Sequence, residues 1–140
     1  MKINIKKLHP NAVIPKYAKE GDAGMDLTAV AILEKTPYSI TYDTGLAFEI
    51  PEGFVGYIFP RSSIRKYGLL LSNSVGVVDS GYRGSVQATF KRTSHVDNYY
   101  NVGDRIAQIV IMPIPYVEFT EVEELSSTER GEGGFGSTGK

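Results

Sequence analysis

Side chains that could bind or attack a phosphate gather in five glycine-punctuated stretches of this 140-residue chain. In chain order the stretches are GDAGMDLTA (21–29), PRSSIRKYGL (60–69), SNSVGVVDSGYRG (72–84), VGDRIAQI (102–109) and RGEGGFGSTG (130–139). The chain has no cysteine and two isolated histidines, His9 and His95. This excludes thiol nucleophiles, disulfides and zinc sites built from cysteine or clustered histidine.

The stretch PRSSIRKYGL has the composition of a phosphate-binding turn. We expect a strand to end at Pro60 and a short helix to cover residues 62–67, with Ser62 as its N-cap. The free N–H groups at a helix start, here beside the cation of Arg61, suit a phosphate group. A simple capped helix is the alternative, but a cap needs no cation.

The stretch SNSVGVVDSGYRG is typical of a β-hairpin with a carboxylate at its turn. Asp79 stands between strands expected over 74–78 and 85–92, and aspartate is common in turns for local hydrogen-bonding reasons alone. Tyr82 adds an aromatic face beside it, and the amide of Asn73 could recognise the edge of a base. These neighbours favour a nucleotide site over a plain turn.

The other polar positions are weaker signals. Gln108 interrupts the apolar run over 106–112, and a buried amide without a partner would cost about 1–3 kcal/mol, so it either faces outward or has a function. Asp26 opens a strand and carries little weight alone. Asp104 is expected to form a turn or to pair with Arg105.

The C-terminal stretch is rich in glycine and has little to bury, which predicts a mobile arm. Arg130, Ser137, Thr138 and the glycine amides could surround phosphate oxygens, and Phe135 could cover a flat ring. The spacing matches a P-loop as far as its lysine, but the hydroxyl residue after the lysine, the preceding strand and the following helix are missing. A P-loop is therefore rejected, whereas contact with an aromatic, anionic ligand is retained.

The rest of the chain predicts an all-β protein. Glycines and prolines interrupt it at short intervals, and the segments between them are rich in Val, Ile, Tyr, Phe and Thr. Strands are expected over 29–33, 38–42, 46–50, 54–59, 69–71, 74–78, 85–92, 106–112 and 117–120, with Val86, Ala88 and Phe90 facing a core. Many short strands around a single core indicate a sandwich, a jelly roll or a small barrel.

The chain length and net charge further restrict the number of domains and the kinds of binding partner that we expect. A chain of 140 residues is the size of one domain, and 15 Lys+Arg against 16 Asp+Glu give a net charge of -1. With no long basic block, non-specific nucleic-acid binding is disfavoured. The sequence contains neither a signal-peptide pattern nor an apolar run of about 18 residues, which predicts a cytoplasmic protein that does not bind membranes.

Taken together and in this order, the five stretches resemble the motif set of the trimeric dUTP diphosphatases (dUTPases), from about residue 21 to residue 139. The resemblance implies a dUTPase-like β jelly roll, or distorted barrel, over residues 1–125 with one short helix. It also implies a homotrimer in which three chains build each active site, and an arm over 126–140 that closes a neighbouring site. The implied activity is hydrolysis of dUTP to dUMP and diphosphate, which limits uracil incorporation into DNA and supplies dUMP for thymidylate synthesis.

The resemblance assigns catalysis to Asp79, as the general base for a water that attacks the α-phosphorus. Mg²⁺ would be held mainly by triphosphate oxygens and water, with Asp26 at most contacting a metal-bound water. Phosphate binding is implied for Arg61, Ser62, Ser63, Gln108, Arg130, Gly136, Ser137 and Thr138. Recognition of uracil and deoxyribose is implied for Asn73, Val77, Val78, Tyr82, Gln87 and Phe135.

Two alternatives stay open. The dCTP deaminases share the fold and a PRSS segment, but their catalytic glutamate would fall at Thr89 here, which cannot shuttle protons as a carboxylate does. A nucleotide-sensing or regulatory protein of the same fold would bind without turnover, although no catalytic motif residue is missing. Gly81 stands where an acidic residue is common in the family, which predicts a change in hairpin flexibility.

Overall fold

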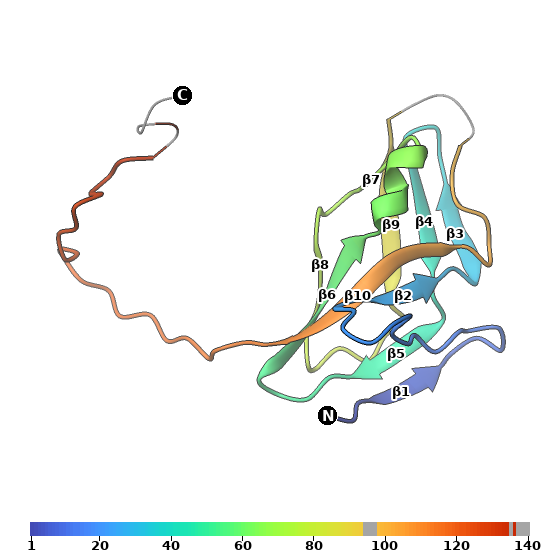
Figure 1. Ribbon diagram of the computed structural model, residues 1–140, viewed down its shortest axis with the longest axis horizontal. Helices are drawn as coiled ribbons and strands as arrows, with labels where there is room; N and C mark the ends of the chain where they lie inside the picture. The colour runs from blue at the N-terminus through green and yellow to red at the C-terminus, as the bar shows by residue number, and fades with distance from the viewer. Residues whose placement is uncertain (94–97, 135, 137–140) are drawn as a thin grey trace.

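The structure is a computed structural model that describes residues 1–93, 98–134 and 136 (Figure 1). Its elements run in the order β1 (Asn4–Lys7), β2 (Met25–Thr28), β3 (Ala31–Lys35), β4 (Ser39–Asp43), β5 (Leu46–Glu49), β6 (Phe54–Pro60), η1 (Ser62–Lys66), β7 (Leu69–Leu71), β8 (Gly76–Val78), β9 (Gln87–Arg92) and β10 (Arg105–Pro113). The element η1 is a 3₁₀ helix. Within the described ranges, no helix has the length and apolar character needed to cross a membrane.

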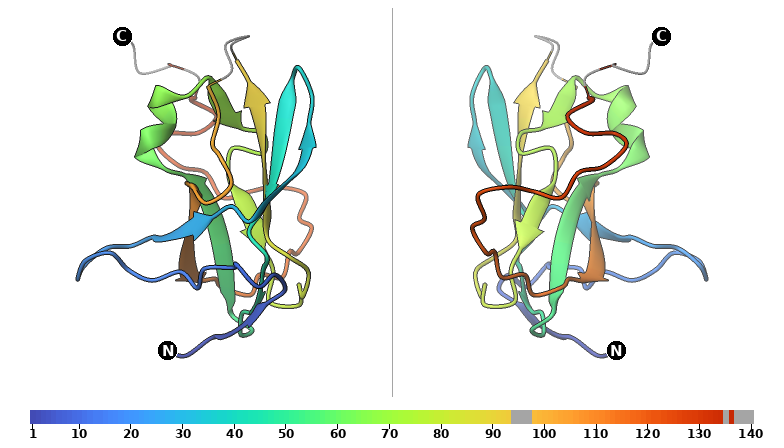
Figure 2. Two further views of the ribbon diagram at one scale, coloured as in Figure 1. Left: turned by 90° about the vertical axis from the view of Figure 1, so that its right-hand side faces the viewer. Right: turned by 90° about the vertical axis from the view of Figure 1, so that its left-hand side faces the viewer.

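The strands form two four-stranded sheets and one two-stranded sheet. The orders are β2-β10-β6-β8, β3-β4-β9-β7 and β1-β5, and every pair is antiparallel. Side chains from all three sheets build one hydrophobic core, and η1 lies at one end of the strands (Figure 2). The expected all-β jelly roll with one short helix is confirmed.

The core is built by strands in which every second residue is apolar. Ile40 and Tyr42 of β4 are fully buried, and their antiparallel partners in β9 are Phe90 and Ala88. Val86 is buried as well, so the expected inward face of β9 is confirmed. Each large apolar side chain buried in this way contributes about 1.5–3 kcal/mol.

A turn at residues 43–45 connects β4 to β5. Gly45 has a φ of +63°, and a Cβ at this position would lie 2.6 Å from the Cβ of His9, so a larger residue does not fit. The N–H of Gly45 donates to Oδ1 of Asp43 at 3.0 Å. This is the local hydrogen bond that makes aspartate common in turns.

Two buried tyrosines tie β4 to the loop before β10. The hydroxyl of Tyr42 donates to the carbonyl oxygen of Tyr100 at 2.8 Å, and the two rings pack edge to face with centroids 6.3 Å apart. The ring of Phe90 also packs edge to face against Tyr42, at 5.9 Å. Burial raises the pKa of Tyr42 far above its ordinary value, so its hydroxyl remains a donor.

The N-terminal strands differ from the prediction. No alternation indicates β1, in which only Ile5 is partly buried. The strand expected over 29–33 begins at Ala31 and continues to Lys35, whereas Met25–Thr28 forms β2 in the other sheet. Ala29 and Val30 are buried where the chain passes between the sheets, so burial rather than strand pairing explains their apolar character.

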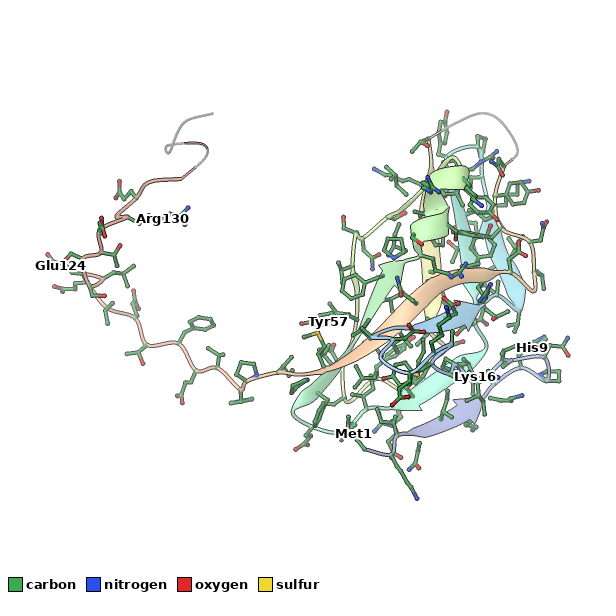
Figure 3. The ribbon with its side chains drawn as sticks, in the orientation of Figure 1. Met1, His9, Lys16, Tyr57, Glu124 and Arg130 are labelled. Atoms are coloured by element: carbon green, nitrogen blue, oxygen red, sulfur yellow. The ribbon has the colours of Figure 1, made fainter. Side chains whose placement is uncertain are left out.

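The strand expected over 117–120 is wrong. Residues 115–134 form neither a strand nor a helix, and they run away from the body of the protein (Figures 1 and 3). Tyr116 and Phe119 are 102% and 93% exposed, because no strand among the described residues lies beside them. The apolar pattern of this segment therefore has no partner among the described residues.

Changing Tyr42 to Phe tests the tyrosine link. The buried carbonyl oxygen of Tyr100 would lose its donor, so we expect Tyr42→Phe to lower the free energy of unfolding by about 1–3 kcal/mol. Urea unfolding at matched protein concentration measures this change. Tyr38→Phe is the matched control, because Tyr38 is 77% exposed and its loss of a hydroxyl should change stability by less than about 0.5 kcal/mol.

Candidate active site

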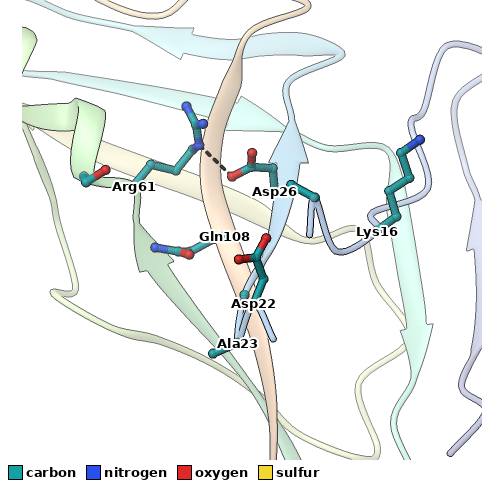
Figure 4. A pocket seen from close by; sticks show the side chains of 9 residues that line it. Lys16, Asp22, Ala23, Asp26, Arg61 and Gln108 are labelled. Carbon is teal, nitrogen blue, oxygen red and sulfur yellow. Dashed lines mark hydrogen bonds and ion pairs between the residues drawn. The ribbon is translucent and has the colours of Figure 1, made fainter. Parts of the chain in front are cut away.

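A carboxylate between two arginines organises one end of the sheet β2-β10-β6-β8. Oδ1 of Asp26 in β2 lies 2.6 Å from Nε of Arg61, and Oδ2 lies 3.0 Å from Nη1 of Arg105 in β10. Arg61 directly follows β6, so its pair with Asp26 crosses β10 (Figure 4). The Asp26 and Arg61 side chains are only 27% and 22% exposed, so water and salt screen them less than a fully exposed pair.

A β-bulge in β10 brings Arg105 to the face that carries Asp26. The pairing of β10 with β2 shifts register between Arg105 and Ala107. Under strict alternation, residues 105 and 108 would point to opposite faces of the sheet. The extra residue of the bulge corrects this, so Arg105 pairs with Asp26 and Gln108 stands opposite the same residue.

A cavity of about 320 Å³ opens beside these side chains. It is lined by Lys16, Ala18, Asp22, Ala23, Gly24, Asp26, Arg61, Ser62 and Gln108 (Figure 4). Nε2 of Gln108 donates to the carbonyl oxygen of Pro60 at 3.0 Å. Oε1 then faces Gly24, where an added Cβ would overlap it. Gln108 is therefore a partnered side chain that faces the cavity, which favours a function for it.

The start of η1 borders the same cavity. Ser62 is the first helical residue and Arg61 takes the N-cap position without a capping side chain. The expected cap by Ser62 is wrong, because the N-cap position falls one residue earlier than predicted. Nη1 of Arg61 donates to Oγ of Ser63 at 3.1 Å and to the carbonyl oxygen of Arg105 at 3.3 Å. Among the described residues, Nη2 of Arg61 has no partner and remains able to donate to a ligand.

A second cavity, of about 230 Å³, lies on the hairpin that carries Asp79. Its lining includes the predicted site residues Asn73, Val77, Val78, Asp79, Tyr82 and Gln87. The hairpin strand β8 is the edge of its sheet, so its outer backbone N–H and C=O groups are unpaired by β6. Such groups can hydrogen-bond the edge of a flat ring.

Asp79 presents a free carboxylate on a braced turn. It is exposed, and within residues 1–93, 98–134 and 136 its carboxylate has no hydrogen-bond or ion-pair partner. The N–H of Tyr82 donates to the carbonyl oxygen of Asp79 at 3.1 Å. Nη1 of Arg83 donates to the carbonyl oxygens of Ser80 and Tyr82 at 2.6 and 3.0 Å. A carboxylate held in this way can accept a proton from water.

Tyr82 lies over the end of the same turn. Its hydroxyl donates to the carbonyl oxygen of Ser85 at 3.0 Å, and an added Cβ at Gly84 would overlap that hydroxyl. The glycine therefore gives the ring room to fold over residues 84 and 85. This places an aromatic face at the rim of the hairpin cavity.

On one chain the two cavities lie far apart and share no lining residue. Gly56 of β6 pairs with Val78, the residue before Asp79, whereas Arg61 stands beyond the far end of β6. Five residues of extended strand separate these points by roughly 17 Å. A single chain therefore does not bring Asp79 to Arg61.

The two described C-terminal candidates, Arg130 and Gly136, line neither cavity. Arg130 is exposed on the extended segment, where its Nε donates to the carbonyl oxygen of Gly133 at 2.8 Å (Figure 3). Gly136 is exposed as well. Phe135, Ser137 and Thr138, like His95, lie outside the described residues.

Three cationic side chains, Arg105, Arg83 and Lys16, lie near the cavities, although the sequence predicted no role in the site for any of them. Arg105 pairs with Asp26 and not with Asp104, whose Oδ2 accepts the N–H of Asn101 at 2.7 Å and forms the expected turn. Arg83 lies inside the hairpin stretch, so its position was a usable signal. Lys16 precedes the first stretch, and only its charge indicates a contact with a phosphate.

A divalent cation could bind near Asp26 only if a ligand supplied most of the coordinating oxygen atoms. The described residues contain no group of three His, Asp or Glu side chains that could enclose a metal ion. Asp26 already contacts an arginine with each carboxylate oxygen. Polyphosphate oxygens and water would have to complete the coordination, which is how Mg²⁺ usually binds at phosphate sites.

Comparison with known proteins gives a consistent result. The family model described as dUTPase matches residues 10–139. The deoxyuridine 5'-triphosphate nucleotidohydrolase of Wolinella succinogenes is 46% identical, with 100% of this chain and 95% of the relative covered. The enzyme of the same name from Nautilia profundicola is 44% identical, with 100% of both chains covered.

Solved structures match over nearly the same length. The dUTPase of Staphylococcus bacteriophage 80alpha, solved with dUpNHpp, has a TM-score of 0.86 and 30% sequence identity, with 99% of both chains covered. A mutant dUTPase of the S. aureus phage phi11, described with a structural Mg(II) ion, has a TM-score of 0.77 and 28% identity. The match covers 91% of this chain and 100% of the phi11 chain. Because the family model and the relatives match almost end to end, this chain belongs to the dUTPase family.

Proposed function

We propose that this chain hydrolyses dUTP to dUMP and diphosphate, with Asp79 activating the attacking water and Mg²⁺ bound to the triphosphate. One observation carries this proposal: the hairpin cavity combines a free carboxylate, an aromatic ring and an edge strand. These groups suit a reacting phosphorus, a sugar and a base. The phage 80alpha relative solved with dUpNHpp supports the choice of nucleotide.

The proposed reaction is an in-line displacement at the α-phosphorus. The carboxylate of Asp79 takes a proton from water as the water oxygen bonds to phosphorus. The bond between the α-phosphorus and its bridging oxygen breaks, so diphosphate leaves with that oxygen and dUMP keeps the new one. The hydrogen bonds from Arg83 restrict where the turn presents the carboxylate, and such orientation lowers the entropic part of the barrier.

Arg61, Ser62, Ser63 and Gln108 would bind the phosphate chain. Asp26 holds Nε of Arg61, which leaves Nη2 directed to a ligand as a charge-assisted donor. When bound, Mg²⁺ would neutralise and orient the triphosphate. Asp26 would contact the ion only through a bound water, and the phi11 relative described with a structural Mg(II) ion shows that a member of this family binds this metal.

The hairpin would recognise the nucleoside. Asn73 and the backbone of Val77 and Val78 would bind the uracil edge, with Gln87 nearby, and Tyr82 would stack on deoxyribose and exclude a 2′-hydroxyl. The hairpin is tightly built, since a Cβ at Gly76 would lie 3.0 Å from the Cβ of Ile58. A close fit of this kind would also reject the methyl group of thymine by steric clash.

We further propose that the active enzyme is a homotrimer whose sites are shared between chains. The separation of Asp79 from Arg61 supports this, because a second copy could supply the missing half of each site. The exposed apolar residues Tyr116 and Phe119 support it too, because an uncovered apolar segment indicates contact with another molecule. In this arrangement, Arg130, Phe135, Gly136, Ser137 and Thr138 would close over a site on a neighbouring copy.

The rival functions differ in product. A dCTP deaminase needs a catalytic carboxylate at position 89, but Oγ1 of Thr89 lies 3.0 Å from Oγ1 of Thr41 and offers no such group. A regulatory protein that binds nucleotide without turnover would release nothing. Diphosphate from dUTP, ammonia from dCTP, or neither product therefore separates the three functions.

Replacing Asp79 with Asn tests the proposed base. We expect wild-type protein to release diphosphate from dUTP with Mg²⁺, and Asp79→Asn to lose at least about 100-fold in kcat, because the amide cannot accept the proton. Binding of dUpNHpp, measured by calorimetry, should stay within a few-fold. A variant that turns over dUTP at the wild-type rate would overturn the assignment of Asp79.

Mixed trimers test the shared site. Asp79→Asn and Arg61→Ala chains should each be inactive alone, yet random co-assembly would give about a quarter of the sites both native residues from different chains. We expect activity to return in the mixture, measured by diphosphate release. If Asp79 and Arg61 of one site came from the same chain, mixing would restore no activity.

Deleting residues 130–140 tests the proposed closing arm. We expect unchanged urea unfolding, because this segment adds nothing to the described core, together with at least about a tenfold loss of kcat/KM. Deleting only residues 139–140 is the control for an altered chain end. Undiminished turnover in the longer deletion would remove the arm from the mechanism.

A further inference from the structure

Tyr100 contains a buried hydroxyl that packing alone does not explain. The residue is 1% exposed, and its ring packs against Tyr67 and Phe90 with centroids 4.2 and 5.8 Å away. Among the described residues, its hydroxyl is the one buried side-chain polar atom without a hydrogen-bond partner. An unpaired buried polar atom destabilises the folded protein, and phenylalanine would keep the ring contacts without that penalty.

Tyr100 packs against the end of η1, the short helix that borders the phosphate cavity, because its ring centroid lies 4.2 Å from that of Tyr67, the residue after η1. Burial raises the pKa of Tyr100, and the Ser63 hydroxyl and the Arg61 guanidinium act against that rise. These opposing effects agree with the packing of Tyr100 against the end of η1, although the Tyr100 hydroxyl forms no hydrogen bond with Ser63 in the structure. Ser63 is in η1, whose residues are not buried, so a small shift could close this contact.

The hydrogen-bond capacity of Ser63 gives this contact a function. A serine hydroxyl has one proton and two lone pairs. Nη1 of Arg61 already donates to Oγ of Ser63 at 3.1 Å. If Tyr100 donated to the other lone pair, both acceptor positions would be filled, and Ser63 could only donate its own proton outward.

We propose that Tyr100 is a positioning residue for phosphate binding: its buried hydroxyl donates to Ser63 when the ligand arrives and directs the Ser63 proton to a phosphate oxygen. This inference rests on the proposed function, because it requires a phosphate at Ser63. It assigns Tyr100 no contact with the reacting atoms. In the free protein the Tyr100 hydroxyl is unpaired among the described residues, and its hydrogen bond to Ser63 forms only when the ligand is bound.

Binding of two ligands to Tyr100→Phe tests this role. We expect dUpNHpp to bind about 5- to 30-fold more weakly than to wild type, whereas deoxyuridine, which has no phosphate, binds equally well. Urea unfolding should show stability that is unchanged or higher, because the unpaired hydroxyl is gone. A merely structural role would instead weaken both ligands or lower stability.

Two further variants test whether Tyr100 affects phosphate binding through Ser63. Ser63→Ala should weaken dUpNHpp, and adding Tyr100→Phe to it should weaken binding no further, because Tyr100 acts through Ser63. Tyr67→Phe removes a hydroxyl from the ring stacked on Tyr100 and should leave the ratio of the two affinities unchanged. Additive losses in the double variant, or an unchanged ratio in Tyr100→Phe, would overturn the proposal. Failure of wild-type protein to bind dUpNHpp would instead overturn the proposed function.

Discussion

The carboxylate of Asp26 contacts two guanidinium groups, and the proposed phosphate half of the site depends on this arrangement. Its two oxygens hold Arg61, which follows β6, and Arg105 in β10. Breaking either contact would leave a half-buried charge less compensated. Because Nε of Arg61 is fixed in this way, the rest of its guanidinium is directed to Ser63 and to the cavity. The ion pairs thus orient donors as well as joining strands.

Antiparallel pairing imposes a second constraint. Since β6 and β8 run in opposite directions, Asp79 follows β8 at one end of the pair and Arg61 follows β6 at the other. No loop movement of ordinary size brings them together within one chain. In the proposed function the sheet presents two half-sites, and the uncovered apolar segment after β10 gives a physical reason for copies to associate. Assembly and catalysis would then have the same structural origin.

Local chemistry explains which predictions succeeded. The period of two in Val86, Ala88 and Phe90 identified a buried face, and the short gap between the strands expected over 38–42 and 46–50 located the turn at Gly45. The same kind of signal failed at 117–120, where an apolar pattern has no partner strand in its own chain. It failed again at Ser62, because the helix boundary depends on where β6 ends.

The sequence by itself determined the residue types of the site, since phosphate and nucleoside binding need particular side chains in particular local turns. It placed Asp79 with Tyr82 on a hairpin and Arg61 with Ser62 after a strand, because these neighbours are close along the chain. Only the tertiary structure decided that a bulge turns Arg105 toward Asp26 and that the Tyr100 ring stacks on Tyr67 at the end of η1. Those contacts join residues far apart in sequence, and they follow from strand register and packing, which no local pattern encodes.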